Sequence, residues 1–301
     1  KSLLKCAGIE AFYAEIGSGD YQEIKYPKFA SADQTNHIIV CVPDAQDTIW
    51  LECTSQKIPM GYIGDNNMNR YALLIKPEGG VLVRTPNYSS EQNTKLVQTK
   101  LSVQEDGSAK FTFQGNYQNF MFEEVFPLYY YSPDDQKKML LKKLSSKSFT
   151  IDNFSLTDAS DSAAKAQLVV NGKLAQIATK SGNRLFVTPT YLSESDNFDK
   201  IQAKRTKNVF QSMAYSSSDK LDIEIPANYA IESLPQDTEV KSVFGSYALY
   251  ATRVGNNIRI ERKITTHAGS FAPTLFAAIN DYKQQVQLAN SQKIILKRTD
   301  Q

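Results

Sequence analysis

Residues 35–55 read TNHIIVCVPDAQDTIWLECTS, which is two strand-forming runs joined by a polar turn at residues 43–48. If Val42 faces Ile49 across that turn, every other residue shares a face, because strand side chains alternate. One face then carries a mixed set: His37, Ile39, Cys41, Trp50, Glu52 and Thr54. The other face is wholly apolar: Ile38, Val40, Val42, Ile49, Leu51 and Cys53. The stretch predicts a β-hairpin with one core face and one face bearing a histidine and a carboxylate.

His37 and Glu52 are the chemically informative pair in this hairpin. In the register above they lie on a diagonal between strands, about 7–8 Å apart at the backbone, within reach of a side-chain hydrogen bond. A carboxylate in that place fixes the tautomer of the imidazole, as in catalytic triads. The alternative is two polar side chains on a solvated strand. Trp50 on the same face weighs against full solvation, because a large ring prefers cover.

The start of the chain has the pattern of a helix that is ending. Residues 1–7 fit the last two turns of an amphipathic helix, and Gly8 stands where such a helix stops. A helix of about seven residues is marginal by itself. We therefore expect the sequence to begin inside a domain, with residues 9–16 following as a strand.

Three segments carry a resemblance to a known family. LLKCAGIEA at 3–11, NHIIV at 36–40 and WLECTS at 50–55 resemble the second half of a bacterial transglutaminase-like domain. More narrowly, they are similar to a group of large exported bacterial proteins of unknown function in which β-sandwiches flank that domain. The resemblance implies a papain-like α+β core and an extracytoplasmic location, in the periplasm or at the cell surface. It also implies a Cys-His-acid triad that acts on protein or peptide amides.

Carried over by position, His37 matches the triad histidine, and Glu52 matches the acid, where Asp is commoner. Asn36, Trp50 and Thr54 would line the site. The resemblance places the nucleophilic cysteine several residues before Lys1, so this chain would supply two triad members and be inactive by itself. Cysteine protease and transglutaminase-like acyl transfer both remain open for the full-length protein. The alternative is a non-catalytic extracytoplasmic binding or assembly module on a retained scaffold.

The three cysteines of the chain offer no substitute nucleophile. Cys6 lies near the C-terminal end of its helix, where the helix dipole opposes thiolate formation. Cys41 shares the face of His37 but has no activating neighbour in sequence, and Cys53 is expected in the core. Three cysteines make no disulfide framework, and no metal-ligand spacing or cofactor motif is present.

Composition narrows the remaining function classes. The chain has 301 residues and a formal charge of +2, so it lacks the long-range positive field of a nucleic-acid binder. No apolar run approaches the roughly 18 residues of a membrane span. The length suggests two domains, which we place at residues 1–70 and 71–301; the sequence leaves the oligomeric state open.

From Tyr71 onward the sequence alternates in short runs separated by turn residues. These predict three hairpins: 95–104 with 109–117, 167–170 with 173–177 around Asn171-Gly172, and 246–254 with 258–265. Such spacing indicates a mainly antiparallel β-sandwich. The fold class predicted for the whole chain is therefore α+β, a partial transglutaminase-like core followed by that sandwich.

Two helices are expected within the second domain. One spans about 133–144, with Ser132 as its cap, and the other about 273–289. The closing strand at 293–296, with residues 244–247 upstream, also resembles the C-terminal domain of the same exported family. The aromatic residues between Phe120 and Tyr131 either form a carbohydrate or peptide platform or fill the core.

Overall fold

The structure is a computed structural model that describes residues 1–19, 24, 28, 32–44, 48–143, 149–158, 164–189 and 206–299. Strands account for 49% of it and helices for 19%. The protein is therefore mostly β, and the α+β fold class predicted from the sequence is wrong. The reason lies largely in residues 1–84, where the described residues form a five-stranded sheet, one short α-helix, α1 (Ser2–Cys6), and two 3-10 turns, η1 (Ala32–Gln34) and η2 (Asp65–Asn67).

The first sheet is antiparallel throughout and has the order β3-β2-β1-β4-β5. Its strands are β1 (Phe12–Ile16), β2 (His37–Pro43), β3 (Thr48–Leu51), β4 (Tyr71–Lys76) and β5 (Gly79–Arg84). The expected domain boundary after residue 70 cuts through this sheet. Strand β1 is the central strand of this sheet, and its backbone is hydrogen-bonded to β2 on one side and to β4 on the other. Because β4 also pairs with β5, the sheet continues to Arg84.

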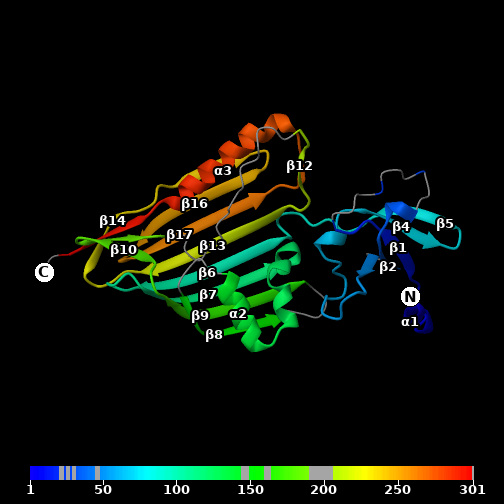
Figure 1. The fold of residues 1–301 in the computed structure, drawn as a ribbon, viewed down its shortest axis with the longest axis horizontal. Coiled ribbons are helices and arrows are strands. Elements are labelled where there is room, and N and C mark those ends of the chain that lie inside the picture. The colour runs from blue at the N-terminus through cyan, green and yellow to red at the C-terminus, as the bar shows by residue number, and fades with distance from the viewer. Residues whose placement is uncertain are drawn as a thin grey trace.

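The second sheet has eight strands in the order β15-β16-β17-β13-β6-β7-β9-β8. Along the chain these are β6 (Thr94–Val103), β7 (Ala109–Gln118), β8 (Phe149–Asp158), β9 (Lys165–Leu174), β13 (Tyr215–Glu224), β15 (Thr238–Ser242), β16 (Gly245–Val254) and β17 (Asn257–Thr266). Neighbours are antiparallel except β6 and β13, which pair in parallel at the centre. Figure 1 shows the sheet as a broad twisted surface beside the smaller first sheet.

Smaller elements complete the part of the chain that follows the first sheet. A four-stranded sheet has the order β10-β11-β19-β14: β10 (Ala178–Ser181), β11 (Arg184–Val187), β19 (Ile294–Arg298) and β14 (Tyr229–Ser233). Strands β12 (Val209–Gln211) and β18 (Gly269–Phe271) form a pair. The helical segments are η3 (Asn119–Glu124), η4 (Phe126–Tyr130), α2 (Pro133–Lys143), η5 (Pro273–Leu275) and α3 (Phe276–Ser291). Both predicted helices are therefore present, and Ser132 Oγ accepts a bond from the backbone of Asp135 at the start of α2.

One face of the eight-stranded sheet is buried. On β6, Lys95, Val97, Thr99, Leu101 and Val103 are buried, whereas the residues between them are partly or fully exposed. Helix α3 contacts β15, α2 contacts β8, and η3 contacts β6, β7 and β9 (Figure 1). The buried residues of the four-stranded sheet belong to the same hydrophobic core. In the described part of the chain, no helix has the length and apolar character needed to cross a bilayer.

Two of the three predicted hairpins of the second part are confirmed, β6 with β7 and β16 with β17. The third is wrong, because Asn171-Gly172 lies inside β9, which runs unbroken between β7 and β8. A Cβ atom on Gly172 would lie 2.0 Å from the carbonyl oxygen of Thr150 on β8. The register shifts close by, between Ile151 and Asn153. The glycine allows a close strand approach beside a bulge rather than a turn.

Candidate active site

The hairpin that carries His37 has the predicted register. Val42 pairs with Ile49 and Cys41 with Trp50. The extent of burial on its two faces is the reverse of the prediction, however. Ile39, Cys41 and Trp50, on the face of His37, belong to the main core. The apolar face contributes Val40 and Val42 to a small separate cluster, against which Leu4 of α1 packs. The His37 face is covered because Tyr62, Ile63 and Met68 join the same core, which strand alternation alone does not reveal.

His37 and Glu52 meet at the end of this hairpin. His37 is the first residue of β2, and Glu52 directly follows β3. The Nε2 atom of His37 lies 2.8 Å from Oε2 of Glu52, and the exposed fractions of the two side chains are 22% and 4%. Within the described residues, Nδ1 of His37 makes no hydrogen bond. The acid therefore holds one ring nitrogen from the protein side, while the other remains available to an outside partner.

The other oxygen of Glu52 is held by Thr54. The Thr54 backbone N–H donates to Oε1 at 2.9 Å and its hydroxyl donates at 2.8 Å. Burial by itself would raise the pKa of Glu52, but the hydrogen bonds from His37 and Thr54 outweigh it and lower the pKa. An ionised carboxylate only accepts hydrogen bonds. The network therefore assigns the proton of a neutral imidazole to Nε2, which leaves Nδ1 with the lone pair of a base.

Asn67, in η2, is a member of the site that sequence reasoning missed. Its Nδ2 atom donates to Oε2 of Glu52 at 2.8 Å and to the carbonyl oxygen of Ile63, also at 2.8 Å. The side chain is buried, with 4% of the residue exposed. The only local signal is the polar turn sequence around it, which is typical of any surface loop, so the contact with Glu52 could not be read from the sequence.

Of the three residues predicted to line the site, Thr54 alone is placed on the dyad. Trp50 is 5% exposed and packs in the core. Asn36 exchanges hydrogen bonds with the backbone of Ser18, accepting at 2.7 Å and donating at 3.3 Å. Asn36 therefore connects the two ends of the loop between β1 and β2, and Trp50 contributes its ring to the main core.

All three cysteines are free thiols. Cys41 is buried, and burial raises the pKa of its thiol against the opposing charge of Lys76. Cys6 is exposed. Cys53 is also exposed rather than in the core, because β3 ends at Leu51 and the alternation stops there. Across the described ranges, no group of three or more His, Cys, Asp or Glu side chains could hold a metal ion.

Comparison with protein families identifies one region of the chain. A family model described as a domain of unknown function with solved structure (DUF3858) matches residues 183–296. This region excludes His37 and Glu52. A search of curated proteins gives no match.

The chain also has structural similarity to solved structures. One is described as a "putative protease" from Parabacteroides distasonis, with a TM-score of 0.49 and 10% sequence identity. The alignment covers 98% of this chain and 41% of that chain. The chain thus spans less than half the length of that protein.

Proposed function

We propose that His37 and Glu52 are the base and the orienting acid of a cysteine-dependent acyl-transfer site. The single observation that carries this proposal is the bond between Nε2 of His37 and Glu52, with Nδ1 left open. In Cys-His-acid sites the acid binds one ring nitrogen while the other takes the proton of the nucleophile. The resemblance of residues 1–70 to the second half of a transglutaminase-like domain supports the same assignment, and an extracytoplasmic location rests on that resemblance.

The chemistry follows from the positions of the donors. A thiol would transfer its proton to Nδ1 of His37, and the resulting imidazolium would remain paired with the Glu52 carboxylate. The thiolate would attack an amide carbonyl of a protein or peptide, and the C–N bond would break as Nδ1 returns the proton to the departing amine. Water or a second amine would then cleave the thioester, giving hydrolysis or transamidation respectively.

The thiol belongs, in this proposal, to residues outside the 301 of this sequence. Cys41 is buried with a raised thiol pKa, and Cys6 lies in α1, which packs through Leu4 against the face opposite His37. The sulfur of Cys53 faces the carbonyl oxygen of Leu51 at 3.8 Å.

The test uses the polypeptide as its genome encodes it, including whatever precedes Lys1. Thiols are alkylated with iodoacetamide across the pH range in which imidazole titrates, and mass spectrometry locates the labelled cysteine. We expect one thiol to react at least about tenfold faster than a free cysteine, because a paired imidazole favours the thiolate. His37→Ala should abolish that excess. The only other histidine of the chain provides the control, and His267→Ala should change nothing.

Two results would overturn the proposal. The first is the absence of a hyper-reactive thiol, and the second is an equal alkylation rate in the natural protein and in His37→Ala. Either would leave the non-catalytic binding or assembly module as the interpretation of this scaffold. Unfolding curves of both histidine variants confirm that the compared proteins are folded.

A further inference from the structure

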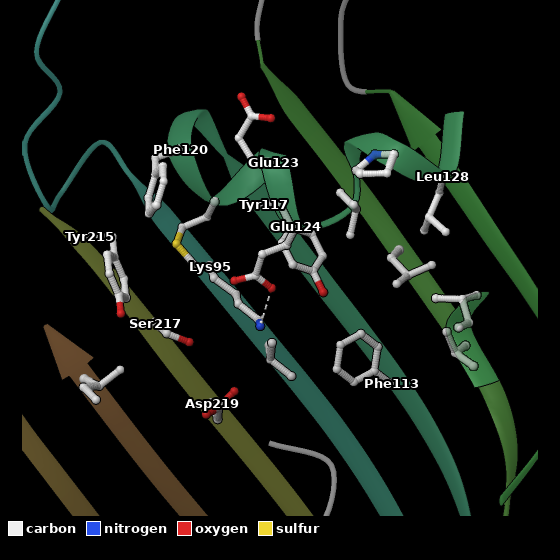
Figure 2. A pocket seen from close by; sticks show the side chains of 18 of the residues that line it. Lys95, Phe113, Tyr117, Phe120, Glu123, Glu124, Leu128, Tyr215, Ser217 and Asp219 are labelled. Carbon is white, nitrogen blue, oxygen red and sulfur yellow. Dashed lines mark hydrogen bonds and ion pairs between the residues drawn. The ribbon is translucent and has the colours of Figure 1, made fainter. Parts of the chain in front are cut away.

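A cavity of about 610 Å³ lies on the inner face of the eight-stranded sheet, lined by residues other than His37 and Glu52 (Figure 2). Strands β6, β7, β9, β13 and β17 supply its floor, and η3, η4 and α2 supply its wall. Its volume is in the range of sites that bind small molecules, about 300–1,000 Å³. The size therefore suits one drug-sized ligand rather than a single water or ion.

The lining divides into an apolar end and a polar end. Phe113 on β7, Leu168 and Val170 on β9, and Leu140 on α2 line the apolar end. Lys95 on β6, with Ser217 and Asp219 on β13, lies at the polar end, as Figure 2 shows. A ligand that fills the cavity must accordingly have a hydrocarbon or ring body and a polar end.

The charges at the polar end are already compensated by the protein. Lys95 Nζ lies 2.7 Å from Glu124, and Arg262 lies 2.6 Å from Asp219. The exposed fractions of the Lys95 and Arg262 side chains are only 10% and 6%. A charged ligand group would lose its hydration and would have to compete with a counter-ion already in place. The pairing favours an uncharged polar end.

The carboxylate of Glu123 does not alter this balance. It accepts a hydrogen bond from the hydroxyl of Tyr62 at 2.8 Å. Figure 2 shows it directed away from Lys95 and Ser217, on the outer side of η3. Burial raises the pKa of Glu123, so its charge is disfavoured as well.

Ser217 supplies the group that points to a ligand. The residue is 8% exposed, and within the described part of the chain its hydroxyl makes no hydrogen bond. Figure 2 shows the hydroxyl directed into the cavity beside Lys95. Its oxygen is not among the fully enclosed polar atoms that lack a partner, so it is reached from the cavity and is placed to bond a molecule inside it.

We propose that the cavity binds an uncharged amphiphile, with its hydrocarbon body against Phe113, Leu168 and Val170 and a hydroxyl or amide end hydrogen-bonded to Ser217. This function is separate from the proposed acyl-transfer chemistry and does not depend on it. The hydroxyl of Ser217 would bond the polar end group of the ligand. Because Lys95 and Arg262 already have carboxylate partners, a charged end group is disfavoured.

The experiment uses the full chain and a neutral fluorescent probe, N-phenyl-1-naphthylamine. Binding is followed by fluorescence, and the probe is displaced by 1-decanol, decanoate or decyltrimethylammonium below the concentrations at which these form micelles. The three competitors share one chain length and differ in the charge of the end group. We expect saturable probe binding, and displacement by decanol at about tenfold lower concentration than by either ion.

Variants of two adjacent serines locate the site. Ser217→Ala should raise the decanol concentration needed for displacement about threefold to tenfold, as expected for one lost hydrogen bond. Ser217→Leu should block probe binding by filling the polar end. Ser218→Leu is the matched control, because Ser218 follows Ser217 on β13 and points to the opposite face of the sheet; it should bind as the natural protein does.

The proposal is overturned if the folded protein shows no saturable probe binding, or if either charged competitor displaces the probe as well as decanol does. An unchanged decanol concentration in Ser217→Ala would also overturn it. Thermal unfolding monitors the variants, and if Ser217→Leu does not fold, the comparison of Ser217→Ala with the natural protein decides.

Discussion

Asn67 and His37 bind the same oxygen of Glu52, each at 2.8 Å, although they lie on opposite sides of it in the sequence, each fifteen positions away. Thr54 holds the second oxygen with its backbone N–H and its hydroxyl. The carboxylate therefore keeps three of its four hydrogen bonds when the imidazole moves. Preorganisation of this kind orients a base without requiring the acid to rearrange.

Removing Asn67 should weaken both the fold and the dyad. Asn67→Ala loses the bonds to Glu52 and to the carbonyl of Ile63, so we expect the free energy of unfolding to fall by about 1–3 kcal/mol in urea titrations. The His37-dependent alkylation rate should fall as well. Asn66→Ala, at the exposed neighbouring position, is the control and should be neutral. Unchanged stability in Asn67→Ala would contradict the network.

Glu52 should make stability depend on pH at the acid end. Its pKa in the folded protein is lowered from the ordinary value of 4.5. The folded state therefore favours the ionised carboxylate, and this stabilisation is present above about pH 4.5 and lost as the pH falls through the folded-state pKa.

Urea unfolding of Glu52→Gln tests that dependence. The difference in free energy of unfolding between the natural protein and the variant should be greatest near neutral pH and shrink in acid. A difference that grows on acidification would reverse the assigned direction. The exposed residue Glu224, on β13, provides the matched glutamine variant.

Glu123 should show the opposite behaviour. Burial raises its pKa from the ordinary value of 4.5, the hydrogen bond from Tyr62 opposes that rise, and the charge of Asp65 adds to it. Stability from this group is present at low pH and is lost as the pH rises from about 4.5 through the folded-state pKa. Glu123→Gln, which can still accept the Tyr62 bond, should unfold at a higher temperature than the natural protein at neutral pH. The gain should narrow in acid, and equal melting temperatures at neutral pH would refute it.

Two ion pairs between β13 and β17 offer a matched comparison of buried and exposed charge. Asp219 and Arg262 face each other, as do Asp222 and Arg259. The first pair has side-chain exposures of 14% and 6%, the second of 40% and 37%. Asp219→Ala should cost about 3–5 kcal/mol, because it leaves a buried guanidinium without its carboxylate.

Asp222→Ala should cost less than about 1 kcal/mol, as exposed pairs generally do. Chemical denaturation of the two variants side by side gives the comparison. Equal costs would show that burial does not determine the value of these pairs.

The hairpin register was predictable because the turn at 43–48 and the alternation of apolar residues fix the pairing of Val42 with Ile49. The approach of His37 to Glu52 follows from the same alternation. Which face joins the main core was not predictable, because the residues that cover it, such as Ile63 and Met68, come from a loop without periodicity. Asn67 escaped prediction for the same reason.

A glycine indicated a turn correctly at one position of the sequence and wrongly at another. Gly255 has a positive φ and lies in the turn between β16 and β17, as predicted. Gly172 stands in an equally turn-like dipeptide, yet it serves the packing of β9 against β8. Gly255 adopts the positive φ of a turn, whereas Gly172 does not and allows β8 to approach instead. The neighbouring strand is a long-range property that a local pattern does not contain.

The parallel contact between β6 and β13 has a consequence for the recognised family region. The match at residues 183–296 takes in β13 but leaves β6 outside it. In a polypeptide cut at those limits, β13 would lose its partner β6, and its backbone from Ser216 to Glu224 would become an unpaired sheet edge. Unpaired edges pair with strands of other molecules and so promote self-association. The stretch that sequence comparison recognises is therefore narrower than the sheet that completes the hydrogen bonds of β13.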